Sequence, residues 1–313
     1  MSLVISDLTQ AVPDFAASAN DMGSTPELVL DDRFGRWGST GLSPDLHVGT
    51  MVDHLGTVSL EELVGTSELL TRRDRKYLIP TKDLPTILGC FEDGSRVLQI
   101  GSLREFAYES VYFDTPDRLS YRMAVHQRRR RFKVRTRSYM EVGSTYLELK
   151  TKGTRGMTVK NRCEYDLSDR RELTLEGSLY LARLLDEYSY EPSIVTELVP
   201  TLMTQYHRVT VLLPEGGRVS VDSSLQWRTP EGRSMNLEAF SIVESKSSGS
   251  ASGFDRCLWG LGYRPSRFSK YGTGMAGFHP ELPRNKWNRT LRLINAESHT
   301  HGAEHEFTWR ELL

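Results

Sequence analysis

Basic residues recur at every second position in several segments of the chain, a spacing that places side chains on one face of a β-strand. The clearest case is 131–137, where Arg131, Lys133, Arg135 and Arg137 alternate with apolar or small residues. Further cations at such positions are Lys76, Lys150, Lys152, Lys160, Arg162, Arg208 and Lys246. Arginine offers paired donors that match phosphate oxygens, and lysine offers a compact charge. The pattern therefore predicts a site for a phosphate-rich polyanion.

On any single strand, alternating charge is more typical of a sheet face that meets water. Like charges on directly opposed strands repel each other, however. Several basic strands side by side would crowd cations without benefit unless an anion lay between them. Taken together, the strands favour a bound anion over a solvated face.

Carboxylates are interspersed among these cations, at Asp74, Glu148, Glu164 and Glu244. They would repel phosphate directly, but they suit a divalent metal that bridges protein and phosphate oxygens. Because all of these donors are oxygens, Mg²⁺ or Mn²⁺ is the expected ion. Lysines, carboxylates and a divalent metal are the components of phosphoryl transfer.

The elements that must position these residues are mostly strands. Period-two patterns predict strands over 72–79, 106–114, 130–140, 145–152, 156–166, 205–213, 218–227 and 239–247. Helical patterns cover 81–91, 117–126, 174–188, 251–261 and 285–295. Many strands with few helices between them indicate an α+β fold. We expect a closed antiparallel β-barrel of eight strands, with a charged interior and surrounding helices.

Composition and charge narrow the class of protein. The chain has 313 residues, of which 38% are hydrophobic and 26% charged, as in globular proteins. Its formal net charge of −1 argues against a general nucleic-acid binder. The run Arg128–Arg131 has few aromatic neighbours for base stacking, so we interpret it as the mouth of the anion site and expect no nucleic-acid partner.

Targeting features and cysteines suggest a cytoplasmic protein. No apolar stretch is long enough to cross a bilayer, and the first residues do not resemble a secretory signal. The three cysteines, Cys90, Cys163 and Cys257, are far apart and form no CxxC pair. This spacing predicts neither a disulfide framework nor a zinc site, and it favours a reducing compartment.

The chain divides into three parts by composition. We expect a mobile acidic leader over 1–58, a folded domain over 59–280, and a C-terminal helix with a polar tail over 281–313. Residues 1–60 contain eight acidic and two basic residues, so the remainder carries five more bases than acids. The acidic leader could fold back onto the basic site as a mimic of its polyanion.

Eight short motifs, in order, resemble the VTC domain, the polyphosphate polymerase branch of the triphosphate tunnel metalloenzyme (CYTH-like) superfamily. They are Arg73-Asp74-Arg75-Lys76-Tyr77, Ser110-Val111-Tyr112-Phe113-Asp114-Thr115, 131–139, Leu147-Glu148-Leu149-Lys150, Lys160-Asn161-Arg162, Tyr206-His207-Arg208, Val243-Glu244-Ser245-Lys246 and Arg267-Phe268-Ser269-Lys270-Tyr271. They cover roughly 70–275. Each motif is weak alone, and their common order makes the resemblance specific.

The resemblance implies a β-barrel tunnel in which a polymerase transfers the γ-phosphate of ATP onto a growing polyphosphate chain, with Mn²⁺ or Mg²⁺ as cofactor. Glu244 would be the metal ligand, with Glu148 and Asp74 as further candidates. Arg118 or one of Arg128–Arg131 would provide a further tunnel arginine, and spacing leaves that choice open. The residues expected to be catalytic are Lys76, Arg135, Arg137, Lys150, Lys160, Arg208 and Lys270. Further phosphate contacts are expected from Arg131, Lys133, Lys152, Arg162, Lys246 and Arg118.

The first strand departs from the hydrolase branch of the superfamily, which carries alternating glutamates there. This chain has the single acid Asp74, which favours a polymerase over a triphosphatase. Two alternatives remain, an inorganic or nucleoside triphosphatase and a non-catalytic polyphosphate-binding module. The chain has no transmembrane segment of its own, so any membrane coupling would come from a partner protein. The sequence does not predict an oligomeric state.

Overall fold

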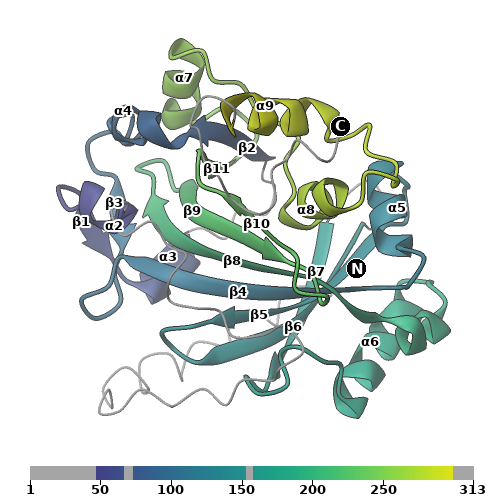
Figure 1. Ribbon diagram of the computed structural model, residues 1–313. Helices are drawn as coiled ribbons and strands as arrows, with labels where there is room; N and C mark the ends of the chain where they lie inside the picture. The colour runs from purple at the N-terminus through teal and green to yellow at the C-terminus, as the bar shows by residue number, and fades with distance from the viewer. Residues whose placement is uncertain (1–46, 67–72, 153–157, 299–313) are drawn as a thin grey trace.

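One large curved sheet organises the molecule (Figure 1). The computed structural model describes residues 47–66, 73–152 and 158–298. The strands are β1 (Gly56–Val58), β2 (Arg73–Pro80), β3 (Arg96–Leu98), β4 (Glu105–Asp114), β5 (Phe132–Tyr139), β6 (Ser144–Lys152), β7 (Thr158–Tyr165), β8 (Val199–Leu212), β9 (Arg218–Arg228), β10 (Ser234–Leu237) and β11 (Phe240–Ser247). The eight predicted strands correspond to β2, β4 to β9, and β11.

The strands form an eleven-stranded sheet rather than the expected closed barrel of eight. Its main path runs β2-β11-β9-β8-β4-β5-β6-β7, and every pair along it is antiparallel. β10 adds to β9, and β3 adds to β8 and carries β1 in parallel. Within the described residues, the end strands β2 and β7 are not hydrogen-bonded to each other. The antiparallel α+β prediction is therefore confirmed, and closure into a barrel is not.

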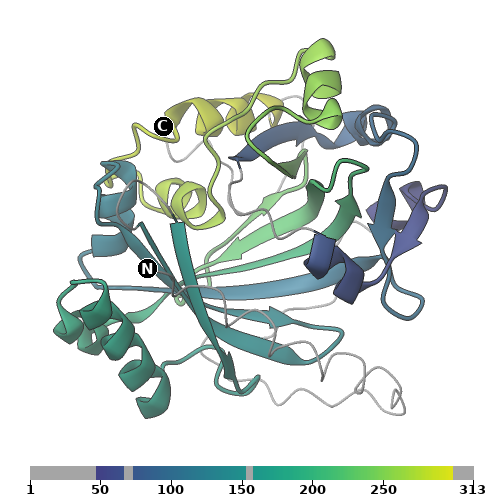
Figure 2. The same cartoon turned by 180° about the vertical axis from the view of Figure 1, so that it is seen from behind.

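Helices cover the apolar outer face of the sheet at both ends (Figures 1 and 2). The helices are α2 (Val48–Met51), α3 (Leu60–Thr66), α4 (Leu84–Leu88), α5 (Leu119–Val125), α6 (Leu175–Glu187), α7 (Gly253–Gly260), α8 (Lys270–Phe278) and α9 (Asn288–Ser298). Residues of α4 and α7 pack against outward residues of β2, β11, β9 and β8. Residues of α6 pack against β4, β5 and β6. Burial of these alternate apolar residues leaves the charged residues on the opposite, inner face.

Helix α8 was absent from the sequence prediction because its sequence, KYGTGMAGF, contains three glycines that disfavour a helix. The structure requires two of them for close packing. A Cβ at Gly272 would lie 2.1 Å from the Trp287 ring, and one at Gly274 would lie 2.4 Å from the Trp227 ring. Together with α5 and α9, α8 covers part of the inner face with an apolar cluster.

A disulfide joins Cys90 to Cys257, a pairing that the cysteine spacing did not predict. The two residues are 167 positions apart, but the fold brings the end of α4 next to α7. Sequence spacing alone gave no signal of this proximity. The argument from cysteine spacing for a reducing compartment therefore loses its basis.

The folded part of the chain begins before residue 59, where the sequence predicted it to start. Helix α2 and strand β1 precede that residue, and the side chains of Val48 and Val52 are fully buried. Most of the predicted leader, residues 1–46, lies outside the described residues, as does the tail from 299 onward. Among the described helices, none is both long and apolar enough to span a membrane.

The disulfide yields a stability prediction. Cys257→Ser should lower the free energy of unfolding by about 2–4 kcal/mol, because a crosslink over a long loop restricts the unfolded chain. Urea denaturation without reductant measures the loss. Cys163→Ser, which changes the free cysteine, is the matched control and should leave stability within about 0.5 kcal/mol. Equal unfolding midpoints for wild type and Cys257→Ser would contradict the crosslink.

Candidate functional site

The strand register places the predicted basic residues on one face of the sheet. Glu244 lies opposite Lys76, and Arg135 lies opposite Glu148. Directly opposed residues share a face, and alternate residues extend it along each strand. We call this set the charged face. It consists of Lys76, Lys133, Arg135, Arg137, Glu148, Lys150, Lys160, Arg208, Asp222, Glu244 and Lys246, together with Lys270 from the start of α8.

The charged face lies inside the curl of the sheet. A flat sheet would separate β2 from β6 by about 29 Å, since six spacings of about 4.8 Å lie between them. Burial and then Lys76 on β2 nevertheless lower the pKa of Lys150 on β6. Burial, Lys150 and Lys76 likewise lower the pKa of Lys133. One short loop before α8 also contacts both strands, because the Lys76 carbonyl of β2 accepts the Ser266 N–H at 2.7 Å and Lys133 Nζ of β5 donates to Ser269 Oγ at 2.9 Å. Cations from distant strands therefore face one another across the inside of the sheet.

One buried carboxylate holds two of the predicted catalytic cations. Asp222 on β9 is 1% exposed, and it accepts hydrogen bonds from Arg208 Nε at 2.5 Å and Nη2 at 2.8 Å. Lys270 Nζ donates to Oδ2 of the same carboxylate. Burial acts to raise the pKa of Asp222, but Arg208 and then Lys270 outweigh it and hold the pKa well below its usual range. Sequence reasoning missed Asp222, although its period-two place on a predicted strand was a signal.

Two other carboxylates, Glu148 and Glu244, also form ion pairs with cations of the charged face. Glu148 accepts a hydrogen bond from Arg135 Nε at 2.7 Å, and Lys160 Nζ lies 2.5 Å from its other oxygen. Glu244 Oε1 lies 2.6 Å from Lys246 Nζ. Both acids have a pKa well below the usual value, because neighbouring cations outweigh the effect of burial. Both therefore stay ionised at neutral pH.

Three lysines of the charged face form no ion pair with any described residue, and these are Lys76, Lys133 and Lys150. Lys133 Nζ donates instead to Ser269 Oγ at 2.9 Å. Because they lie within reach of one another's charge, the three ammonium groups repel each other. A multivalent anion placed among them would relieve that repulsion.

Further lysines of the charged face also lose protons more readily than free lysine. Burial is the main cause in each case, and like charges add to it. The pKa of Lys160 falls to about 7, and the pKa values of Lys150, Lys246 and Lys270 fall to about 8. Protonation of these groups is therefore sensitive to pH near neutrality and to the arrival of an anion.

Tyrosines line the charged face beneath the cations. Tyr108 and Tyr206 stack with ring centroids 5.2 Å apart, and the Arg208 guanidinium lies 5.2 Å from the first centroid and 5.3 Å from the second. Lys270 Nζ lies 3.9 Å from the Tyr206 centroid. The buried Tyr206 hydroxyl has no hydrogen-bond partner among the described residues. Sequence reasoning did not select these rings as site residues, although both occupy inward positions on strands.

The placement of Lys270 depends on another buried carboxylate. Asp114, at the end of β4, accepts the Tyr271 hydroxyl at 2.5 Å and the backbone N–H groups of Ser120 and Tyr121. Ser269 caps α8 by accepting the N–H of the third helical residue at 3.1 Å. These bonds fix the first turn of α8 over the charged face, which is where Lys270 must lie to reach Asp222.

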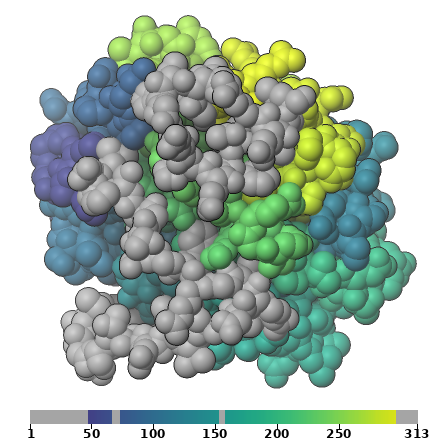
Figure 3. Space-filling view, viewed as in Figure 1, coloured from purple at the N-terminus to yellow at the C-terminus, as the bar shows by residue number. Residues whose placement is uncertain are grey.

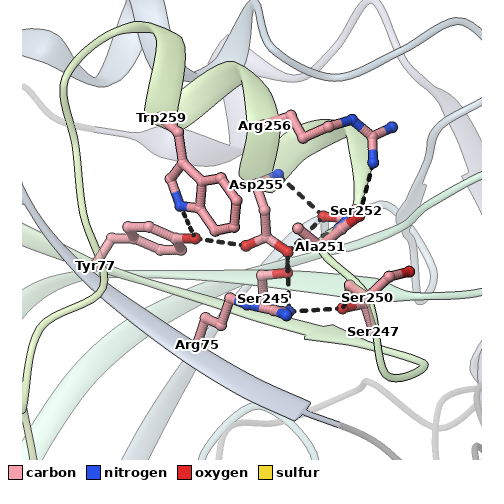
Figure 4. A network of polar contacts seen from close by, with 10 residues as sticks. All are labelled: Arg75, Tyr77, Ser245, Ser247, Ser250, Ala251, Ser252, Asp255, Arg256 and Trp259. Atoms are coloured by element: carbon pink, nitrogen blue, oxygen red, sulfur yellow. Dashed lines mark hydrogen bonds and ion pairs between the residues drawn. The ribbon is translucent and has the colours of Figure 1, made fainter.

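A polar network on the outer face supports β2 and β11 (Figure 4). Asp255 of α7 is fully buried and accepts the Tyr77 hydroxyl at 2.6 Å and the Ser245 hydroxyl at 3.1 Å. Arg75 Nη1 lies 3.3 Å from the same carboxylate. Lys76 sits between Arg75 and Tyr77 in sequence, so anchoring its neighbours outward keeps Lys76 directed inward.

The remaining predicted residues occupy the edges of this arrangement. Lys152 and Arg162 continue the charged face along β6 and β7, and Arg131 immediately precedes β5. Asp74 lies opposite Lys246 at the exposed start of β2. Arg118 lies outside the strands at the start of α5, where its Nη1 donates to the Thr115 carbonyl.

The predicted metal ligands do not gather into one cluster. Within the described ranges, no group of three or more His, Cys, Asp or Glu could hold a metal ion. Glu148 is engaged by Arg135 and Lys160, and Glu244 is engaged by Lys246. Glu244 lies opposite Lys76 and Asp74 lies opposite Lys246, so the register places both acids on the same face of β2 and β11. Proteins commonly bind Mg²⁺ through one or two carboxylates, and substrate phosphates supply further ligands. Glu244 with Asp74 therefore fits a divalent ion bound together with its phosphate ligand.

Comparison with known proteins identifies the family. The family model described as the VTC domain matches residues 71–279, more than half of the chain. The chain belongs to the VTC domain family. The match includes every residue of the charged face, and it confirms the resemblance seen in the sequence motifs. No curated protein matches the chain.

Among solved structures, this VTC domain protein is similar to the Hippeastrum protein HpAC1, for which a dominant triphosphatase activity is described. The identity is 18% and the TM-score 0.43, over 65% of this chain and 95% of the other. A conserved hypothetical protein from Pyrococcus furiosus shows 14% identity and a TM-score of 0.33, over 61% and 88%. The PH1819 protein from Pyrococcus horikoshii OT3 shows 12% identity and a TM-score of 0.38, over 65% and 98%.

The lowered lysine pKa values predict an unusual pH dependence of stability. Free lysine titrates near 10.4, so the folded protein binds fewer protons than the unfolded chain at pH values between about 7 and 10. Stability therefore rises with pH in this window, and the cost of charging the lysines is fully present below it. From Lys246 and Lys270 alone, the free energy of unfolding of the ligand-free protein should rise by about 1–2 kcal/mol between pH 6.5 and 8.5.

Urea denaturation at several pH values in this range measures the slope. Lys270→Arg is the informative variant, since arginine stays charged and should flatten the profile. Lys82→Arg, which changes a lysine with no part in the charged face, should leave the slope unchanged. A free energy of unfolding that falls or stays constant between pH 6.5 and 8.5 in the wild type would contradict the lowered lysine pKa values.

Proposed function

We propose that this VTC domain protein is a metal-dependent polyphosphate polymerase that transfers the γ-phosphate of ATP onto a growing polyphosphate chain. The observation that carries the proposal is the surplus of positive charge on the charged face. Asp222, Glu148 and Glu244 neutralise some of its cations, whereas Lys76, Lys133 and Lys150 lack ion-pair partners among the described residues. A chain of phosphates is the ligand class that matches a row of such cations.

The reaction needs positioning and charge stabilisation more than covalent chemistry by the protein. A terminal phosphate oxygen of the chain attacks the γ-phosphorus of ATP, the bond to the β,γ-bridging oxygen breaks, and ADP leaves. Lys76, Lys133 and Lys150 would hold the phosphates in line, and Arg208 and Lys270 would stabilise the charge that develops in the transition state. Asp222 keeps these last two groups oriented before substrate binds.

The carboxylates favour transfer to phosphate over transfer to water. Glu244 and Asp74 would hold one divalent ion, Mn²⁺ or Mg²⁺, which when bound supplies charge neutralisation at phosphate oxygens. On β2 the alternating inward positions carry a single acid, Asp74, next to Lys76 in the row. A single acid in this row of β2 offers little means of activating a water molecule, which supports a polymerase over a triphosphatase.

Product analysis tests the proposal. The purified full chain, incubated with ATP and Mn²⁺, should yield a ladder of long chains on a gel stained for polyphosphate. Orthophosphate without a ladder would instead establish a hydrolase. Intact ATP with either ion, together with tight binding of tripolyphosphate, would establish a binding module.

Glu244→Gln tests the metal assignment. The substitution should lower turnover by at least about a hundredfold, because it removes a charged ligand while keeping the shape of the side chain. Tripolyphosphate binding, measured by calorimetry without metal, should persist, since the cations remain. Glu187→Gln on the outer helix α6 is the matched control and should keep full turnover. Turnover that survives Glu244→Gln would show that Glu244 does not hold the metal.

A further inference from the structure

Basic side chains from three separate segments meet where the charged face ends at the start of β5. Arg131 precedes β5 in the same period-two row as Lys133, which places both on the inner face. Arg267 lies two residues before the α8 cap Ser269, to which Lys133 donates. Lys286 lies in the turn before α9. None of these segments is adjacent to another in sequence, so their convergence is a product of the fold.

Specific contacts hold α5, α9 and the loop before α8 together. The Arg131 segment joins α5 where the Ser120 hydroxyl donates to the Phe132 carbonyl at 2.7 Å, and Arg131 Nη1 donates to the Arg128 carbonyl at 2.9 Å. The Arg267 carbonyl accepts the Thr290 hydroxyl of α9 at 2.9 Å. Lys286 Nζ donates to the Ala124 carbonyl of α5 at 3.0 Å. In Figure 3 the yellow C-terminal segment and the blue α5 segment adjoin at the right of the molecule. This junction of α5, α9 and the loop before α8 is therefore a fixed part of the surface.

Lys286 is a half-buried ammonium group surrounded by like charge. Burial, then Arg131 and then Arg267, lower its pKa, and no carboxylate contributes. Lys286 in turn lowers the pKa of Lys133, after burial, Lys150 and Lys76. Lys133 donates to Ser269, two residues after Arg267, and the Arg267 carbonyl binds Thr290 of α9, so basic side chains extend from the charged face through Lys133 towards Arg267 and Lys286. Cations held this close without an acid favour the binding of an anion.

We propose that Lys286, Arg267 and Arg131 form a second binding segment for the polyphosphate tail beyond the charged face, which gives the protein a preference for long chains over short ones. We call these three residues the tail site. The inference rests on the proposed function in one respect, namely that the ligand of the charged face is a phosphate chain. A short anion such as tripolyphosphate fills the charged face and does not reach the tail site, whereas a long chain occupies both.

The three arginines that precede Arg131 in sequence contribute less to binding of the phosphate chain than the tail site does. Arg128, Arg129 and Arg130 are exposed, and the guanidinium of Arg130 is engaged by the Ser189 carbonyl at 3.2 Å. Arg267 is exposed as well, whereas Arg131 and Lys286 are partly buried, so water and salt screen the charge of these two side chains less. The sequence prediction of a mouth at Arg128–Arg131 did not include Lys286 or Arg267.

The test compares affinity for two ligands of different length. Calorimetry on the full chain, without ATP or metal, gives dissociation constants for tripolyphosphate and for a polyphosphate of about 60 units. The double variant Lys286→Met/Arg267→Ala should weaken binding of the long chain about tenfold or more, as expected for the loss of two charge-assisted contacts. Its affinity for tripolyphosphate should change less than about twofold. The single variant Lys286→Arg should keep the long-chain preference of the wild type, because arginine keeps the positive charge at this position.

Two controls separate the tail site from a folding defect and from unspecific attraction. Methionine keeps an unbranched apolar side chain at position 286, although it loses the ammonium group that lies 5.4 Å from the Trp287 ring centroid. Arg183→Ala removes an exposed cation on α6 and should change neither affinity. A single-stranded oligonucleotide of similar charge should compete poorly. Equal competition by the oligonucleotide would overturn the proposal, since the surface would then bind any polyanion.

The remaining outcomes also decide the matter. Equal affinity of the wild type for both phosphate lengths, or an equal loss of both in the double variant, would overturn the tail site. Failure of the proposed function is distinguishable, because it shows in the absence of product from ATP while the length preference persists. A lost preference in a protein that still polymerises would reject the tail site alone.

Discussion

The repulsion among the lysines inside the curled sheet is the constraint on which the rest of the structure depends. Lys76, Lys133 and Lys150 come from three strands, and the charge of Lys76, after burial, contributes to lowering the pKa of both Lys133 and Lys150. Burying charge without a partner costs free energy, and the protein tolerates this cost at the place where it binds its ligand. An arrangement of this kind is stable enough to fold, and it becomes more favourable when an anion supplies the missing negative charge.

The surrounding architecture holds this face in place from behind and from above. Asp255 fixes β2 and β11 through the outer face, and Asp114 fixes the first turn of α8 over the inner one. Asp222 then links Lys270 of α8 to Arg208 of β8. Each of these buried carboxylates satisfies several donors, so each one sets the position of more than one element. Removal of one would loosen the charged face as a whole rather than a single side chain.

Much of the fold could be predicted from the sequence because period-two patterns report directly on strands. The row from Arg131 to Arg137 was assigned to one face, and the register of β5 with β6 is consistent with that assignment. The patterns could not report tertiary proximity. Helix α8 was missed because its glycines, poor helix formers, are required by Trp227 and Trp287. The disulfide was missed for a related reason, since only the packing of α7 on α4 brings its cysteines together. Asp222 and the tyrosine rings were overlooked because a single polar or aromatic residue on a strand carries little signal until its neighbours are known.

The most direct measurement of the central claim is thermal unfolding of the full chain with tripolyphosphate, compared with sodium chloride at equal ionic strength. If the anion relieves strain among the buried lysines, tripolyphosphate at about a hundred times its dissociation constant should raise Tm by about 5–10 °C beyond the salt control. The rise should shrink when Lys133→Met removes one of the repelling charges at the centre of the face. An equal shift in Tm for tripolyphosphate and sodium chloride would contradict the account, because the lysines would then be screened by any salt.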